Sequence, residues 1–126
     1  MTKEQALNQF FSSFGYPAYK ENSVKPGAEF PYINYQVSTS SFGDQVPLVA
    51  SIYDRVSNNH SAGTLNDIKE KEISDAVGRG GAFVDFDGNS VWIQRGTPFS
   101  QDMGDPSDPL IRRKLLNFIV EYFSAD

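Results

Sequence analysis

Apolar and polar positions follow two different periods along this chain, one helical and one extended. Near the start, four apolar residues have the i, i+3, i+4, i+7 spacing that lines one face of a helix: Leu7, Phe10, Phe11 and Phe14. Thr2 followed by Gln5 forms a capping-box start, and Gly15 provides a left-handed stop. The pattern predicts a helix from about Thr2 to Phe14, packed by its aromatic side against a sheet.

A second helix is expected in the middle of the chain. Thr64, with Asp67 three residues later, is typical of a helix N-terminus, and Gly78 is typical of a helix end. Between them, five apolar residues form one broad side: Leu65, Ile68, Ile73, Ala76 and Val77. The tetrad Gly78–Gly81 is interpreted as a helix stop, because a phosphate-binding turn precedes a helix and does not follow one.

Three regions have the composition or alternation of β-strands. Aromatic and β-branched residues dominate Phe30–Val37, with Pro31 placed near the start of the strand. Residues 46–53 alternate with a period of two and are expected to pair antiparallel with the first strand across a turn at residues 38–44. Asp87-Gly88 between two β-rich runs predicts a tight hairpin, which requires positive φ at both central positions.

Other segments show no clear period. Residues 16–29 are rich in proline, glycine and polar residues and are predicted to form a loop, as is the segment from Gly96 to Pro109. After it, residues 109–113 predict one helical turn, and the alternation from Lys114 to Ser124 predicts a long strand.

These elements predict a single α+β domain over residues 1–126, with two helices packed on one face of a mainly antiparallel sheet. The chain has no Cys, and its 10 Phe, 6 Tyr and 1 Trp supply bulky core side chains. Its 11 basic and 16 acidic residues give a net charge of −5, which argues against direct nucleic-acid binding. No apolar run is long enough to predict a membrane span or a secretory signal, so we expect a cytoplasmic protein.

The residues that can carry chemistry form no catalytic, metal-binding or cofactor-binding motif, and we predict none of these sites. His60 lies in a polar loop without an obvious carboxylate partner and is interpreted as solvated. Residues 85–89 superficially resemble a calcium loop, but the glycine is at the fourth position and Gly96 stands where a bidentate glutamate is required. A small cation-dependent hydrolase remains the alternative of a different class, and it would use Asp85, Asp87, Asp102, Asp105 and Asp108.

The charge pattern of the last third of the chain suggests an interface instead. Three aspartates recur every three residues, and Arg112-Arg113-Lys114 follows them. Such opposite charges can pair within one chain, remain solvated, or meet across a head-to-tail contact in a ring of identical subunits. Two apolar side chains in the same segment would add affinity. The candidate subunit or tail-tube interface therefore comprises Phe99, Asp102, Met103, Asp105, Asp108, Arg112, Arg113 and Lys114.

Four segments, in this order, resemble a known family. They are Phe-Pro-Tyr-Ile-Asn-Tyr at 30–35, Gly-Arg-Gly-Gly at 78–81, Val-Trp-Ile-Gln-Arg-Gly-Thr-Pro-Phe at 91–99, and Asp-Pro-Ser-Asp at 105–108 followed by Ile-Arg-Arg at 111–113. Together they resemble the tail terminator, or tail completion, proteins of long-tailed phages and prophages of Gram-positive bacteria. The resemblance spans nearly the whole chain.

This resemblance implies a helix-flanked sheet whose copies assemble into a ring, commonly of six, at the head-proximal end of the tail tube. The ring would stop tube polymerisation and contact the head completion or connector protein. The implied partners are thus further copies, the tail tube protein and the connector, in the virion tail and, during assembly, in the host cytoplasm. The family implies no catalytic residues. A head-to-tail joining protein or another minor virion protein is the alternative within this class.

Overall fold

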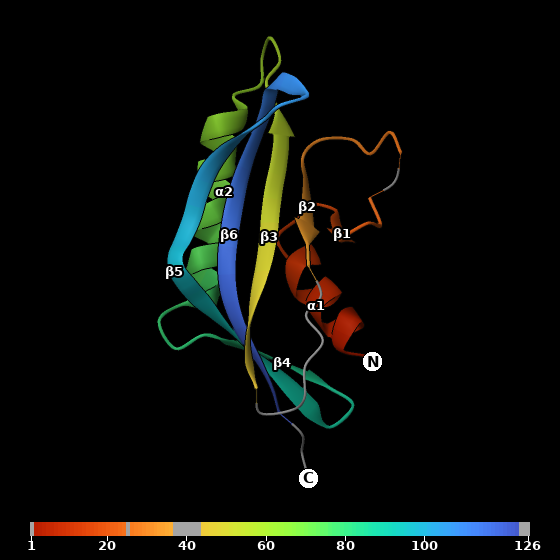
Figure 1. The fold of residues 1–126 in the computed structure, drawn as a ribbon, viewed down its shortest axis with the longest axis vertical. Helices are drawn as coiled ribbons and strands as arrows, with labels where there is room; N and C mark the ends of the chain where they lie inside the picture. Colours follow the sequence, from red (N-terminus) through yellow and green to blue (C-terminus); the bar gives the residue numbers. More distant parts are fainter. Residues whose placement is uncertain (1, 25, 37–43, 124–126) are drawn as a thin grey trace.

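The computed structural model describes residues 2–24, 26–36 and 44–123, and within them the chain forms two helices and six strands (Figure 1). The helices are α1 (Lys3–Ser12) and α2 (Ala62–Val77). The strands are β1 (Ala18–Lys20), β2 (Tyr32–Tyr35), β3 (Gln45–Arg55), β4 (Ala82–Phe86), β5 (Asn89–Asp105) and β6 (Asp108–Phe123). The predicted turn at residues 38–44 and the strand end at Ser124 lie largely outside the described residues.

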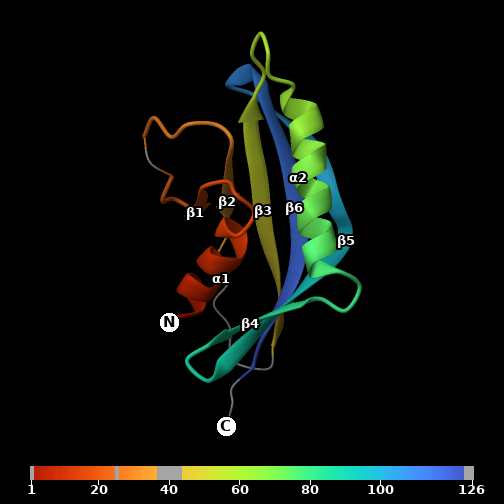
Figure 2. The same cartoon turned by 180° about the vertical axis from the view of Figure 1, so that it is seen from behind.

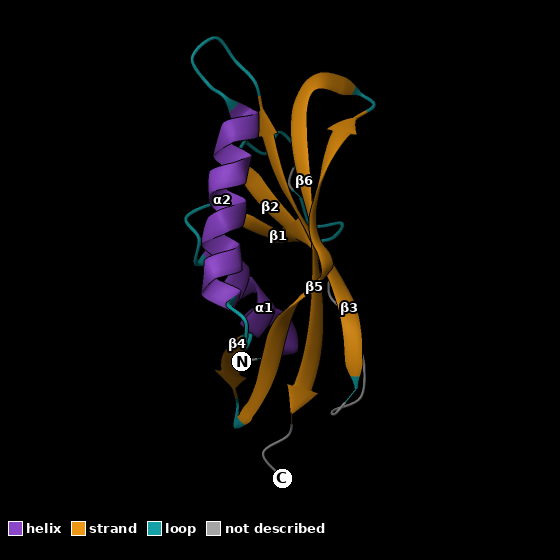
Figure 3. Ribbon diagram, turned by 90° about the vertical axis from the view of Figure 1, so that its left-hand side faces the viewer, coloured by secondary structure: helices purple, strands orange, loops and turns teal. Residues whose placement is uncertain are grey.

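The six strands form one curled sheet in the order β1-β2-β3-β6-β5-β4. Every pair is antiparallel except β1 with β2, which is parallel. Both helices lie on the same side of the sheet (Figures 2 and 3). Alternate residues of β6 face them and are buried: Lys114, Leu116, Phe118, Val120 and Tyr122. The predicted single α+β domain is therefore confirmed.

Helix α1 begins as its sequence predicts. Thr2 is the N-cap, and its side chain and that of Gln5 complete the capping box. The aromatic stripe faces the core, where Phe11 stacks on Tyr35 with ring centroids 4.9 Å apart. Phe14 is only partly buried, because the helix ends before it at Ser12.

Helix α2 begins earlier and is rotated relative to the prediction. Its N-cap is Ser61 and not Thr64, and its buried stripe consists of Ala62, Asn66, Ile73 and Val77. Ile68, expected in the core, is 52% exposed. Polar residues occupy the inner side because they bond to backbone carbonyls there: Asn66 Nδ2 donates to Arg112 O and Lys69 Nζ to Phe14 O. The predicted end at Gly78 is confirmed.

The local β signals predicted two contacts correctly. Strands β2 and β3 pair antiparallel, and the Asp87-Gly88 turn joins β4 to β5 with φ of 46° and 77°. The loop predicted for residues 16–29 contains the short strand β1, which was missed because its three residues carry no measurable period.

The prediction of an irregular loop from Gly96 to Pro109 is wrong. This segment continues β5 to Asp105 and starts β6 at Asp108, with a two-residue turn between them. The alternation is lost because a register shift lies between Arg95 and Ser100. Pro98 is tolerated within this irregularity, where β5 extends beyond its last pair with β4 at Ile93 and has an outer edge free of β4.

The prediction of a helical turn at residues 109–113 is also wrong, since these residues belong to β6. Pro109 is compatible with a strand here because β3 ends at Arg55, which pairs with Ile111, so Pro109 needs no donor toward β3. The long strand predicted from Lys114 onward is confirmed to Phe123.

Candidate functional site

Most of the candidate interface residues lie at one end of the β5–β6 hairpin. Asp102, Met103, Arg112 and Arg113 line a pocket of ≈ 220 Å³ together with residues from the start of α2: Gly63, Asn66 and Asp67. The sequence did not indicate this contribution of α2, because a 47-residue separation between Asp67 and Lys114 has no local signature.

Lys114 is the centre of the charges at this end. Its side chain is almost fully buried and binds the carboxylates of Asp67 and Asp102, the latter at 3.1 Å. Burial alone would lower the pKa of Lys114, but the hydrogen bonds to Asp67 and Asp102 outweigh it and raise that pKa. Asp102 and Lys114 face each other directly across β5 and β6. The two opposite charges therefore meet within one chain.

The remaining charges of the candidate interface are also engaged within the chain. Arg113 Nε donates to Ser51 Oγ at 3.0 Å, and its guanidinium lies over the Tyr53 ring. Arg112 Nη1 donates to the carbonyl of Pro109 at 2.6 Å. The structure thus contains no separate acidic and basic patches made of these residues, and their role in an interface stays a prediction.

Asp105 and Asp108 stabilise the turn between β5 and β6. The hydroxyl of Ser107 donates to Asp105 and is the main cause of the lowered pKa of that carboxyl. The backbone N–H of Ser107 also donates to it and lowers the pKa further. The backbone N–H of Leu110 donates to Asp108 and is the main cause of the lowered pKa of that carboxyl. The Arg55 side chain, whose Nε donates to Asp108 at 2.9 Å, lowers the pKa further. These carboxylates act as turn and strand-end acceptors in the isolated chain.

The two apolar candidates differ in position. Phe99 packs edge-on against Phe118 with centroids 5.4 Å apart and belongs to the margin of the core. Met103 is 40% exposed and is available to a partner. Only Met103 therefore matches the exposed apolar contact expected from the sequence.

His60 is not a solvated residue without a carboxylate partner, which corrects the sequence-based interpretation. Its Nε2 lies 2.6 Å from Oδ2 of Asp54, a side chain buried at the end of β3. Asp54 also accepts from the backbone N–H of Arg55 at 2.8 Å. The pair joins the end of β3 to the loop before α2, and its position indicates a structural role.

The side of the sheet away from the helices is the largest feature that the sequence did not indicate. Outward positions on β3, β4, β5 and β6 carry apolar and aromatic side chains that no helix covers: Val49, Phe83, Trp92, Leu115, Ile119 and Phe123. Phe83 is 62% exposed and stacks on Trp92 with ring centroids 5.5 Å apart. We call these six residues the open sheet face. Phe83 is the exposed member, the other five are half-buried, and outward polar residues such as Asn117 and Glu121 lie between them. Apolar surface that no other element covers is typical of contacts with other proteins.

The carboxylates required by the hydrolase alternative lie at opposite ends of the sheet. Asp85 is next to Ser90, which pairs with Phe123, whereas Asp102 pairs with Lys114. Phe123 and Lys114 are nine residues apart on β6, which corresponds to roughly 30 Å of extended strand. Among the described residues, no group of three or more His, Cys, Asp or Glu side chains has the arrangement of a metal site.

Comparison with known proteins adds a likeness of fold. No protein-family model matches the chain, and no curated protein matches it. A solved structure of a protein whose name states no function is similar, with a TM-score of 0.57 and 11% sequence identity over 94% of this chain and 89% of that one. At this identity the likeness concerns the fold alone. No helix in the described part of the chain is long and apolar enough to cross a membrane.

Proposed function

We propose that this chain is a structural assembly protein, a tail terminator that forms a ring on the head-proximal end of a phage tail tube. The observation that carries the proposal is the open sheet face. Six apolar or aromatic side chains lie there on one side of a sheet whose other side is already filled by both helices. A surface of this composition is stabilised when a second protein covers it.

The free outer edge of β5 is a second surface suited to assembly. Beyond Ile93, β5 has β6 on one side and no strand among the described residues on the other. Unpaired backbone groups along such an edge can be satisfied by another chain. The proposed partners are further copies, the tail tube protein and the head connector, and the order of the motifs at 30–35, 78–81, 91–99 and 105–113 supports the terminator among the virion proteins.

The proposal is tested by polymerising the tail tube protein of the same phage or prophage with and without this chain. Added chain should keep the tubes short, and their length by electron microscopy should stop increasing with time. Ile119→Lys, on the open sheet face, should abolish this effect because it places a charge in the contact. Ile68→Lys makes the same change on the exposed side of α2 and should have no effect.

A chain that leaves tube growth unchanged at every ratio would contradict the proposal. Equal activity of the Ile119→Lys and Ile68→Lys variants would show that the open sheet face is not the contact surface. Thermal unfolding of both variants controls for folding.

A further inference from the structure

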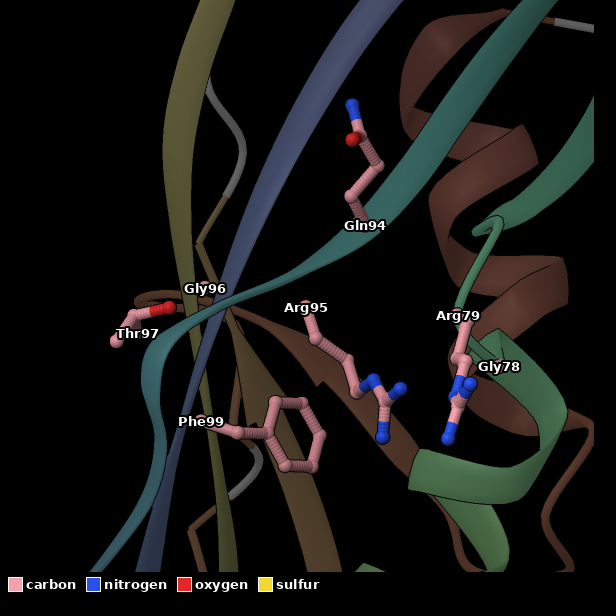
Figure 4. Close-up of a pocket in the computed structure, with 7 residues that line it drawn as sticks. All are labelled: Gly78, Arg79, Gln94, Arg95, Gly96, Thr97 and Phe99. Atoms are coloured by element: carbon pink, nitrogen blue, oxygen red, sulfur yellow. The ribbon is translucent and has the colours of Figure 1, made fainter.

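A pocket of ≈ 390 Å³ lies at the open end of the β4–β5 hairpin, between the end of α2 and the irregularity of β5. Its lining includes Gly78, Arg79, Arg95 and Phe99. Figure 4 shows the side chains of Arg79 and Arg95 directed toward the same space, with the Phe99 ring beside Arg95 and the Gln94 side chain turned away. Two guanidinium groups therefore converge on one open volume.

The charges of these two arginines are not neutralised within the described part of the chain. Arg95 Nη1 donates to the Ser74 hydroxyl at 3.0 Å, a neutral partner. Arg79 makes no hydrogen bond or ion pair with any described residue. The cations elsewhere in ion pairs are Lys20, Arg55, Lys69, Lys71 and Lys114. A convergent arginine pair without an acid is suited to bind a carboxylate through bidentate hydrogen bonds.

The complementary group is present on the chain itself. Asp85 and Asp87 are exposed at the closed end of the same hairpin. The β4–β5 turn projects from one side of the molecule, while the end of α2 and the outer edge of β5 lie on the opposite side (Figures 1 and 2). The acidic turn of one copy can therefore reach the arginine pocket of the next without closing on its own pocket.

We propose that Arg79 and Arg95 bind the carboxylates of the β4–β5 turn of a second copy of this chain. The contact joins two unlike surfaces, so it is heterologous and propagates from copy to copy until a ring closes. A polyanion is disfavoured as the occupant because the chain already carries a net charge of −5. The inference rests on the proposed function in taking a further copy as the partner, and it assigns the surfaces that meet.

A pair of charge variants tests the contact. The pocket variant carries Arg79→Glu and Arg95→Glu. The turn variant carries Asp85→Lys and Asp87→Asn, with asparagine at 87 because φ there is 46° and asparagine tolerates this region. Each variant alone places like charges in the contact, and its self-association by sedimentation velocity should weaken on the order of tenfold or more.

An equimolar mixture of the two variants should restore association. The acidic pocket of one variant then meets the lysine of the other, while the unchanged arginine pocket meets the unchanged acidic turn. Lys71→Glu is the matched control, since Lys71 is an exposed cation on α2, outside the pocket, and its partner is Asp75. It should associate as the parent does, and thermal unfolding should report a folded chain in every case.

Parent-like association of either double variant alone would overturn the inference, as would a mixture that fails to associate. Tube growth, measured in parallel, separates the two proposals. Suppose that the parent stops tube growth, and that the pocket variant both stops it equally well and self-associates like the parent. In that case only the assignment of the pocket fails. If the parent associates through the pocket but tubes grow unchanged, only the terminator function fails. A parent that remains monomeric at all concentrations, with and without tubes, contradicts the inference.

Discussion

Asp54 is a carboxylate with almost no exposed surface, and it has two donors in contact with it. A buried carboxylate is tolerated when hydrogen bonds and a counter-charge replace its lost hydration. Here the backbone N–H of Arg55 donates to Asp54, and Nε2 of His60 lies within hydrogen-bond distance of the same carboxylate. Because these contacts hold the loop that leads into α2, we expect the pair to contribute to stability.

Replacing Asp54 with Asn should therefore lower the free energy of unfolding by about 1 to 3 kcal/mol, since the neutral amide leaves buried polar groups poorly paired. Urea denaturation measures this change. Asp75→Asn is the control, because Asp75 pairs with Lys71 at the exposed surface and should shift stability by less than about 0.5 kcal/mol. Equal small shifts for both substitutions would show that Asp54 has no such role.

Sequence patterns at this scale were informative where partners are close in the chain. The Thr2–Gln5 capping box was predicted because both hydrogen bonds span three residues. The contact of Asp54 with His60 was missed although the two are six residues apart. The available signal was that Asp54 continues the inward alternation of Leu48, Ala50 and Ile52, which indicates burial of its side chain. The contact of Lys114 with Asp67 had no comparable signal, because it depends on how α2 crosses the sheet.

At the scale of elements, the junction between α2 and β4 depends on one glycine. Gly81 has φ of +83°, and a Cβ there would lie 2.8 Å from the carbonyl oxygen of Ile93 and would also clash with the Trp92 indole. Both atoms belong to β5, so the backbone of residue 81 must approach this strand closely. The neighbouring Gly80 has open space around it.

Gly81→Ala should consequently destabilise the fold by about 1 to 3 kcal/mol, whereas Gly80→Ala should change stability by well under 1 kcal/mol. Thermal or chemical unfolding compares the two, and the fluorescence of Trp92 reports the local change. A Gly81→Ala variant as stable as Gly80→Ala would contradict the close approach of this segment to β5.

The turn between β5 and β6 should respond to acid. Because the folded pKa values of Asp105 and Asp108 are lowered, their stabilisation is present above the unfolded pKa, about 4, and is lost as the pH falls through the folded values. The amide resonances of Ser107 and Leu110 should move below pH 4 and stay constant from pH 5 to 8 by NMR. Asp105→Asn should remove the Ser107 response, and a titration flat to pH 2 would exclude these contacts.

The β5–β6 hairpin shows which elements sequence reasoning could not predict. Gly96, Pro98 and Pro109 were interpreted as loop residues, but all three lie in strands at a register shift or beyond the end of a neighbouring strand. Proline and glycine indicate which local backbone conformations are allowed, and they do not indicate whether a segment lies at the edge of a sheet. The Asp87-Gly88 hairpin was predictable because its turn type is set by those two residues.

At the scale of the whole molecule, the two helices fill one side of the sheet and leave the open sheet face, the edge of β5 and the arginine pocket as the surfaces that we propose for contacts. The fold class followed from the alternating and helical periods of the chain. The surfaces did not, because outward residues such as Ile119 and Phe123 alternate with buried ones in a strand that is apolar on both sides. The interface was therefore expected in the segment from Phe99 to Lys114. Arg79 and Arg95 were not singled out from the sequence, although neither has an acidic partner among the described residues.

The most direct test of this account is the position of the chain on assembled tubes. The chain, carrying an electron-dense label, is added to growing tail tubes, and the labelled sites are located by electron microscopy. We expect label at one end of each tube, in a ring, with none along the shaft, since a terminator covers only the growing end. Label distributed along the shaft, or tubes of normal length without label, would contradict the proposed function.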